Sequence, residues 1–242
     1  MEQRWQSETE CVLRGVPIRH LPGGHELTND ERMVVLKPRA FFDAYAAMAA
    51  GMAVESVLEI GVFEGGSIAL LADIWPTAKL VGIDKRGKNP AVLRHLERFN
   101  YMNRVKLYYD TGQDDAKRIE QIIASEFNSP LDIIIDDASH EYELTKRAFE
   151  ITFPHLRAGG LYVIEDWAWA HWRGFPQPGH WQRQPALSNL VFELTMATAS
   201  SRDVIQEVRV DGSVATIRKG VSSGPIEVDK LYATNGRRWG RL

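Results

Sequence analysis

The sequence predicts an α/β domain built on a doubly wound, mostly parallel sheet of seven strands that ends in an antiparallel hairpin. Short apolar runs separated by helix-length segments are typical of buried parallel strands joined by crossover helices. Near the C-terminus, residues 204–219 alternate in polarity around Asp211-Gly212, which indicates a hairpin. The apolar runs occupy residues 56–60, 79–83, 105–109, 132–135 and 161–164.

The segments outside these strands are predicted in chain order. Residues 1–37 contain prolines and glycines without sustained periodicity, so we expect an irregular N-terminal arm with at most one short helix. Residues 38–52 are rich in helix formers and are expected to form a helix that leads into the first strand. After the last parallel strand, residues 167–185 are expected to form an aromatic loop, and residues 185–199 a helix. The main domain therefore spans residues 38–242.

Composition narrows the class of protein. The chain has 242 residues, 44% of them hydrophobic, and a formal net charge of -3, which gives no basic footprint for a nucleic acid. No apolar run has the length of a signal peptide or a membrane span, and the single cysteine, Cys11, allows no internal disulfide, so we expect a cytoplasmic protein with no membrane partner. The length leaves room for an oligomerisation arm, and we expect a homo-oligomer.

The first strand and the turn after it form a candidate ligand site. Residues 58–67 read LEIGVFEGGS, and glycines in a turn that opens a helix let a ligand approach the backbone closely. The spacing differs from the pyrophosphate fingerprint, and Glu59 and Glu64 favour a ligand that carries an ammonium and a sulfonium. Asp84 ends the next strand, where a carboxylate accepts hydrogen bonds from ribose hydroxyls. Alternatively, Glu59 and Asp84 are solvated acids at strand ends, and the glycines only turn the chain.

This combination resembles the motif series of class I S-adenosylmethionine-dependent methyltransferases, from about Val54 to the C-terminal hairpin. The resemblance implies a Rossmann-like methyltransferase fold with S-adenosylmethionine as cofactor. Gln113, Asp114 and Asp115 follow the third strand and are candidates to contact the adenine amino group. The candidate cofactor-binding residues are Glu59, Gly61, Glu64, Gly65, Ser67, Asp84, Gln113, Asp114 and Asp136.

Two neighbouring strands end in acidic residues, with DDASH at residues 136–140 and IEDW at residues 164–167. Because ligands bind at the carboxyl ends of the strands of a doubly wound sheet, these acids are expected to converge. Converging carboxylates repel each other, and a hard divalent cation such as Mg²⁺ resolves the conflict. In the alternative reading, Asp137 or Ser139 only caps the helix that follows.

These acidic motifs look like the metal-dependent branch that includes macrolide and rhamnosyl sugar O-methyltransferases and cephalosporin hydroxylase-like proteins. Carried over by position, the resemblance makes Asp137, Glu165 and Asp166 the metal ligands and His140 the general base, with Asp137 also part of the catalytic set. Asp136, next to the first ligand, would touch the cofactor or orient the loop.

The expected function follows from this chemistry. An alcohol is a poor nucleophile until a cation stabilises its alkoxide, and a neutral histidine removes a proton near physiological pH. We expect Mg²⁺-dependent transfer of a methyl group from S-adenosylmethionine to a hydroxyl of a sugar or glycoside, with a mannoside or rhamnoside as acceptor. The alternatives are O-methylation of a catechol-like diol, a hydroxylase-associated role, and a non-catalytic nucleoside-binding protein.

The aromatic loop, residues 167–185, is the candidate acceptor site. Aromatic rings stack on the apolar faces of sugar rings, so the acceptor is expected to be a small molecule or an oligosaccharide. His171 and His180 lie in the same loop and are candidates to contact the acceptor. The alternative is that the loop is an oligomer interface or a plain hydrophobic lid. Its four tryptophans are Trp167, Trp169, Trp172 and Trp181.

Overall fold

The computed structural model describes residues 5–21, 26–48, 50–174 and 179–237. The chain forms two compact units, Met1–Thr111 and Gly112–Leu242. Seven strands in the order β6-β5-β4-β7-β8-β10-β9 form a mostly parallel sheet, and a small separate sheet has the order β1-β2-β3. The predicted fold class, with its C-terminal antiparallel hairpin, is confirmed.

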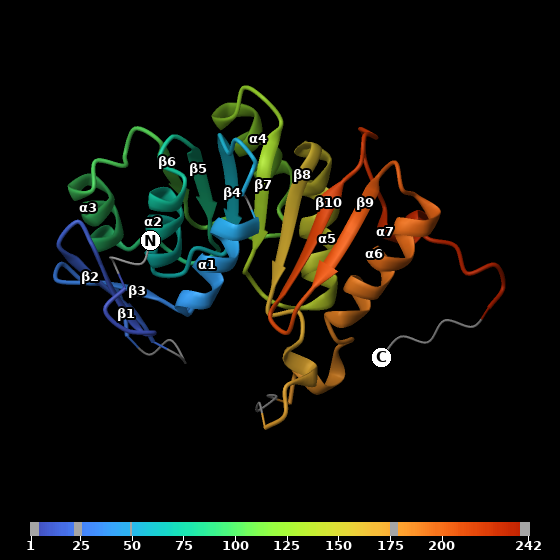
Figure 1. The fold of residues 1–242 in the computed structure, drawn as a ribbon, viewed down its shortest axis with the longest axis horizontal. Helices are drawn as coiled ribbons and strands as arrows, with labels where there is room; N and C mark the ends of the chain where they lie inside the picture. The colour runs from blue at the N-terminus through green and yellow to red at the C-terminus, as the bar shows by residue number, and fades with distance from the viewer. Residues whose placement is uncertain (1–4, 22–25, 49, 175–178, 238–242) are drawn as a thin grey trace. The chain divides into compact units, whose positions relative to one another are not determined.

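The first unit is built around the parallel strands β4, β5 and β6, which lie side by side in Figure 1. All five residues of β4 are buried, which explains why this strand is mostly apolar, with Ser56 and Glu59 as its polar residues. The helix predicted at residues 38–52 is present as α1. The elements of this unit are β1 (Glu10–Leu13), β2 (Val16–His20), β3 (Met33–Val35), α1 (Arg39–Met48), β4 (Ser56–Ile60), α2 (Gly66–Ile74), β5 (Lys79–Ile83), α3 (Pro90–Arg98) and β6 (Val105–Tyr108).

The prediction of an irregular arm over residues 1–37 is wrong for the described part of that segment. β1 and β2 pair antiparallel, and β3 joins β2 in parallel. The register pairs Leu13 with Val16, so Arg14 and Gly15 form a two-residue turn, and both have positive φ (48° and 81°), as a type I′ hairpin turn requires. Strands of three to five residues are too short for periodicity to show, and this turn was the available signal.

The second unit carries the strands that end in acidic residues, β7 and β8, which pair in parallel, and the antiparallel strands β10 and β9 that follow. The predicted helix at residues 185–199 is present as α6. The elements are α4 (Ala116–Glu126), β7 (Leu131–Asp136), α5 (Tyr142–Thr152), the 3₁₀ helix η1 (Phe153–His155), β8 (Leu156–Glu165), the 3₁₀ helices η2 (Trp169–His171) and η3 (Trp181–Arg183), α6 (Ser188–Ser200), β9 (Ile205–Val210), β10 (Val214–Lys219) and α7 (Val228–Leu231).

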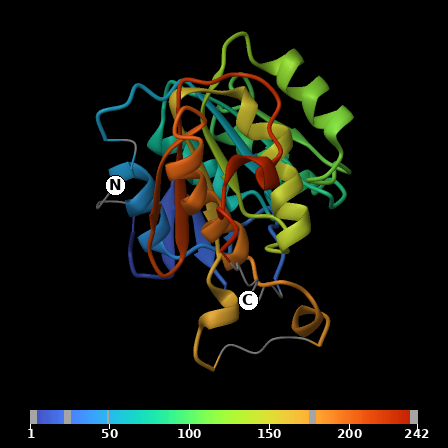
Figure 2. The ribbon, with the colours of Figure 1, turned by 90° about the vertical axis from the view of Figure 1, so that its right-hand side faces the viewer.

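The aromatic loop begins where β8 ends and contains η2 and η3. Figures 1 and 2 show this segment extending beyond the strands of the second unit before the chain returns as α6. Residues 175–178 of the predicted loop lie outside the described residues. Within the described part of the chain, no helix is both long enough and apolar enough to cross a membrane.

Candidate functional site

The glycine turn of the first unit has a backbone that only glycine accommodates easily. Gly61 and Gly65 have φ of 91° and 77°, in the left-handed region. A Cβ on Gly65 would overlap the side chain of Val92, and one on Gly66 would overlap the carbonyl group of Val34. Ser67 is buried in the first turn of α2. The glycines are therefore required by packing as well as by any ligand.

Glu59, predicted as a cofactor contact, lies in a buried ion pair. The Nζ of Lys37 is 2.9 Å from the Oε1 of Glu59, and both side chains are at most 3% exposed. A buried carboxylate needs such a partner, because removing an unpaired charge from water costs several kcal/mol. Lys37 belongs to the segment that the sequence assigned to the arm, and no local pattern marks it.

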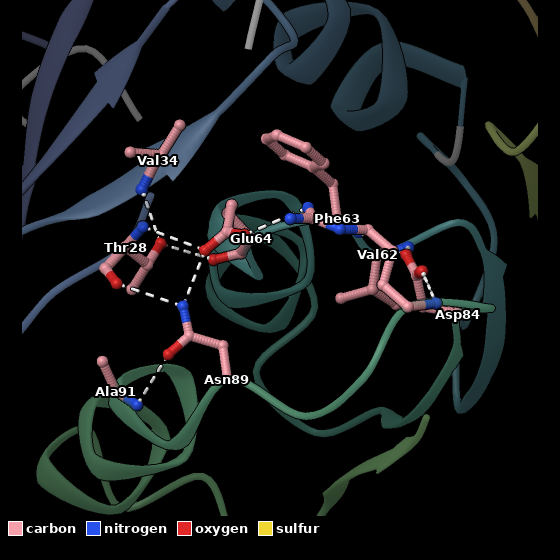
Figure 3. Close-up of polar contacts among 9 residues, drawn as sticks. Thr28, Val34, Val62, Phe63, Glu64, Asp84, Asn89 and Ala91 are labelled. Carbon is pink, nitrogen blue, oxygen red and sulfur yellow. Dashed lines mark hydrogen bonds and ion pairs between the residues drawn. The ribbon is translucent and has the colours of Figure 1, made fainter. Parts of the chain in front are cut away.

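Asp84 holds the glycine turn through backbone amides (Figure 3). Its Oδ2 accepts hydrogen bonds from the backbone N–H of Val62 at 2.9 Å and of Phe63 at 2.7 Å, and its Oδ1 accepts one from Arg86 at 2.7 Å. Phe63 has φ of 50°, which is unusual for a residue other than glycine and is stabilised by this anchor. Asp84, which the sequence predicts to bind ribose, fixes the shape of the turn in the structure.

Tyr109, in the first unit, is a residue that sequence reasoning missed. Among the described residues, its buried hydroxyl has no hydrogen-bond partner. Burial, together with the negative charges of Asp84 and Glu64, raises the pKa of Tyr109 to about 12. A buried donor without an acceptor is costly, so this hydroxyl fits a site that a ligand completes.

The predicted adenine contacts, Gln113 and Asp114, belong to the second unit. Gln113 is 8% exposed, and its Nε2 is buried with no hydrogen-bond partner in the described part of the chain. An unsatisfied buried amide is what a ligand acceptor would satisfy. Asp114 is exposed, and Asp115 caps α4 by accepting a hydrogen bond from the backbone N–H of Arg118 at 3.1 Å.

A cluster of metal-ligating side chains lies after β7 and β8 in the second unit. One ligand atom each from Asp137, His140 and Asp166 lie within 4.8 Å of one another, and all three residues are half-buried. The Nε2 of His140 is 3.7 Å from the Oδ1 of Asp137. The parallel pairing of β7 with β8 brings the two loops together, as the sequence predicted.

Two residues of this cluster have left-handed backbone conformations. His140 has φ of 57° and Asp166 has φ of 56°. Such conformations cost about 1–3 kcal/mol for residues other than glycine and persist where the surroundings enforce them, often at functional sites. The hairpin provides one such constraint, because the backbone N–H of Asp166 donates to the carbonyl of Ser213 at 2.7 Å.

Glu165 and Asp136 are not among the three clustered side chains. Glu165, a predicted metal ligand, is 1% exposed as the last residue of β8, and it is not among the three clustered side chains. Asp136 accepts a hydrogen bond from the hydroxyl of Tyr162 at 2.9 Å, and its Oδ1 accepts one from the backbone N–H of Ala138 at 3.4 Å. Burial raises the pKa of Asp136 to about 7, so near neutral pH it adds less negative charge beside Asp137 than a full carboxylate would.

The four tryptophans of the aromatic loop have two different surroundings. Trp167 and Trp172 donate their indole N–H groups to the carbonyls of Asp211 and Gly212, each at 2.9 Å, and so tie the loop to the hairpin turn. The ring of Trp169, in contrast, lies 4.3 Å from the ring of His140, centroid to centroid.

The remaining aromatic contacts extend from Trp169. The ring centroid of Trp181 lies 6.0 Å from that of Trp169, and the ring of His180 lies 5.2 Å from that of Trp181. His171 instead contacts the Oγ of Ser188 through its Nε2 at 2.8 Å. The loop therefore places the ring of Trp169 beside His140, with the ring of Trp181 next to it.

The order and direction of the strands are those of the Rossmann-like methyltransferase fold. Residues 58–167 match a family model described as a methyltransferase domain. A likeness to a putative caffeoyl-CoA O-methyltransferase from Staphylococcus aureus, at 17% identity and a TM-score of 0.58, covers 78% of this chain and 86% of the other and agrees with the fold.

The curated relatives are longer proteins. The chain is 35% identical over 127 residues to mycinamicin VI 2''-O-methyltransferase of Micromonospora griseorubida, covering 49% of this chain and 29% of that protein. It is 34% identical over 126 residues to demethylmacrocin O-methyltransferase of Streptomyces fradiae, with 49% and 29% covered. The matched part thus spans less than a third of the length of these relatives.

One similar solved structure contains bound groups. It is the MycE methyltransferase from the mycinamycin biosynthetic pathway in complex with Mg and SAH. The likeness has 27% identity and a TM-score of 0.55, and it covers 81% of this chain and 51% of that one. The match reaches well beyond residues 58–167 of this chain.

Proposed function

We propose that this chain is an S-adenosylmethionine-dependent O-methyltransferase that uses Mg²⁺ and acts on a hydroxyl group of a sugar or glycoside. The observation that carries the proposal is the cluster of Asp137, His140 and Asp166 in a chain whose residues 58–167 match the family model of a methyltransferase domain. The relatives named as O-methyltransferases of mycinamicin VI and demethylmacrocin support an oxygen acceptor on a glycosylated small molecule. A mannoside or rhamnoside is the acceptor that we propose.

The donor atoms of the cluster fit a divalent cation. Asp137 and Asp166 supply the carboxylate oxygens that Mg²⁺ prefers, and Glu165, adjacent to Asp166 in the chain, remains the proposed third carboxylate. When bound, the ion would stabilise negative charge on the acceptor oxygen. The three acids would then also fix the position of the ion beside His140.

His140 is proposed as the general base. As the acceptor oxygen bonds to the methyl carbon, the bond from that carbon to the sulfonium sulfur would break and its electron pair would return to sulfur. The hydroxyl proton would pass to the imidazole, so the products are a methyl ether, S-adenosylhomocysteine and protonated His140. The half-buried imidazole lies against Trp169, which limits its contact with water. The positive charge of the sulfonium would thus be replaced by the positive charge of protonated His140, and no further reactant is needed.

The function is tested by mass spectrometry of the purified protein incubated with S-adenosylmethionine, Mg²⁺ and a panel of acceptors. The panel contains mannosides, rhamnosides, a macrolide glycoside and a catechol. We expect a product in which one methyl group replaces one hydrogen on a glycoside, together with S-adenosylhomocysteine. Methylation of the catechol alone would favour the diol alternative, and no product with bound cofactor would favour the non-catalytic one.

The surroundings of the tryptophans predict which of them bind the acceptor. Trp169→Ala is expected to raise the acceptor KM about tenfold, because an aromatic ring beside His140 is lost from the face on which a sugar would stack. The matched control is Trp172→Ala, since Trp172 contacts the hairpin turn instead. Initial rates against acceptor concentration at saturating cofactor measure both. Equal KM values in the two variants would contradict the assignment.

A second prediction concerns cofactor affinity. Asp84→Ala is expected to weaken S-adenosylhomocysteine binding by about 1–3 kcal/mol, because Val62, Phe63 and Arg86 lose the charged acceptor that shapes the turn. Titration calorimetry without metal measures the loss. Asp43→Ala, which removes an exposed carboxylate from α1, is the control and should bind like the wild type. Unchanged affinity in Asp84→Ala would remove this residue from the cofactor site.

The homo-oligomeric state and the cytoplasmic location predicted from the sequence stay part of this proposal. Light scattering of the purified protein tests the oligomer. Fractionation of the producing cells tests the location.

A further inference from the structure

Residues 26–35, here called the clamp segment, contact the glycine turn through Thr28 (Figure 3). The backbone N–H of Thr28 donates to the Oε2 of Glu64 at 2.9 Å, and its hydroxyl donates to the carbonyl of Glu64 at 2.7 Å. Both residues are buried, at 4% and 2% exposed. One residue of the clamp segment thus binds both the side chain and the backbone of the turn.

The hydroxyl of Thr28 also binds Val34 within the clamp segment, and Val34 contacts the start of α2. The Oγ1 of Thr28 accepts a hydrogen bond from the backbone N–H of Val34 at 3.0 Å. Val34 in turn forms a parallel bridge with Gly65, and its carbonyl occupies the space that a side chain on Gly66 would need. The clamp segment therefore lies directly against the turn along Gly65 and Gly66.

Two residues that follow β5, Arg86 and Asn89, also bind the carboxylate of Glu64. The Nδ2 of Asn89 donates to the Oε2 of Glu64 at 2.7 Å and to the carbonyl of Thr28 at 3.1 Å, while its Oδ1 caps α3 at Ala91. The guanidinium of Arg86 pairs with the Oε1 of Glu64 at 3.0 Å, which balances the buried charge. Glu64, predicted to face the cofactor, is fully engaged with protein groups.

Arg86 connects this network to the anchor of the turn. Its backbone N–H donates to Asp84, whose other oxygen holds Val62 and Phe63, and its guanidinium lies 4.4 Å above the ring of Phe63. The turn from Val62 to Gly65 is therefore fixed at one end by Asp84 and at the other by the clamp segment. A shift of the clamp segment would remove the two hydrogen bonds from Thr28 to Glu64 and so loosen the turn.

We propose that the clamp segment sets the affinity of this chain for its cofactor, and that Thr28 is a positioning residue that acts through Glu64. The inference rests on the proposed function, because it requires that S-adenosylmethionine binds at the glycine turn. The clamp segment lies outside residues 58–167, so this contribution is separate from the matched methyltransferase domain. Because coupling is reciprocal, the bound cofactor stabilises the clamp segment by the same factor by which the segment strengthens binding.

The test compares three variants by calorimetry with S-adenosylhomocysteine. Thr28→Val removes the hydroxyl and keeps the shape, and it is expected to weaken binding roughly tenfold, the effect of about two lost hydrogen bonds. Thr28→Ser keeps the hydroxyl and should bind like the wild type. Thr195→Val, in α6, removes a hydroxyl bond of the same 2.7 Å length and is the matched control, with unchanged affinity. At saturating cofactor, the turnover of Thr28→Val should stay close to that of the wild type.

Hydrogen exchange of the wild-type protein provides a second measurement that needs no variant. The backbone N–H groups of Thr28 and Val34 should exchange more slowly when S-adenosylhomocysteine is bound. Wild-type affinity in Thr28→Val, or failure of Thr28→Ser to restore binding, would overturn the inference. If Thr28→Val does not fold, unchanged exchange of the two N–H groups would overturn it. A wild-type protein that binds no S-adenosylhomocysteine would instead contradict the proposed function.

Discussion

Removal of divalent cations with EDTA is expected to reduce methyl transfer to background, and excess Mg²⁺ is expected to restore it. Asp137 and Asp166 place two carboxylates within 4.8 Å of each other. Two carboxylates this close repel each other, and the cation would offset that repulsion and provide the positive charge that an acceptor oxygen needs to become nucleophilic. Initial rates with and without chelator, at fixed cofactor and acceptor, measure the effect. Full activity in EDTA would contradict the metal assignment.

Variants of the two aspartates locate the ion. Asp137→Asn and Asp166→Asn are each expected to lower the rate by about 10² or more, because several kcal/mol of charge stabilisation are lost. Binding of S-adenosylhomocysteine should be nearly unchanged, since cofactor affinity is assigned to other residues. Asp203→Asn, an exposed acid of the same unit, is the control and should keep full activity. A variant that also loses cofactor binding would show that its aspartate is structural.

Much of the fold was predictable because buried parallel strands leave a strong signal. The runs at residues 56–60 and 79–83 coincide with β4 and β5, where nearly every side chain is buried. The first 37 residues gave no such signal, since β1, β2 and β3 have only three to five residues each. A two-residue turn at Arg14-Gly15 marked the hairpin there, but turn chemistry alone is weak without flanking strands of normal length.

The position of the glycine turn was predictable, but the partners of its acids were not. Glu59 and Glu64 were assigned to the cofactor from their place beside the glycines. Their observed partners include Lys37, Thr28 and Asn89, which are 22, 36 and 25 positions away along the chain. Nothing in the local pattern specifies such pairs, because they depend on how the N-terminal strands and the start of α3 pack in the first unit.

The metal-ligating cluster shows a similar limit. The convergence of the acids after β7 and β8 was predictable from parallel strand pairing. The sequence did not predict which of these acids point toward one another. Neighbouring residues on a strand point to opposite faces, and a residue with a left-handed backbone conformation changes the direction of the chain. Asp166 and His140 both have positive φ, and the cluster contains them together with Asp137, whereas Glu165 is buried within β8.

Because His140 belongs to the cluster, it has two possible roles, and its chemistry favours one. Mg²⁺ prefers oxygen ligands, whereas imidazole is a preferred ligand of ions such as zinc and iron. If carboxylates hold Mg²⁺, as proposed, the imidazole would stay available to accept the proton of the acceptor hydroxyl. The Nε2 of His140 lies 3.7 Å from the Oδ1 of Asp137. At this distance the imidazole would reach an acceptor oxygen that an ion bound to Asp137 polarises.

His140→Ala is therefore expected to lower the rate by roughly 10² to 10⁴, the usual contribution of a positioned base, while the affinities for Mg²⁺ and for S-adenosylhomocysteine stay close to those of the wild type. If His140 were instead a metal ligand, the mutation would chiefly weaken Mg²⁺ binding, and extra Mg²⁺ would restore the rate. Asp166→Asn provides the reference for that second pattern, because its loss should appear in the Mg²⁺ titration. Calorimetric Mg²⁺ affinity and the rate at saturating Mg²⁺, measured on all three proteins, separate the two roles: rescue of His140→Ala by metal would exclude the base.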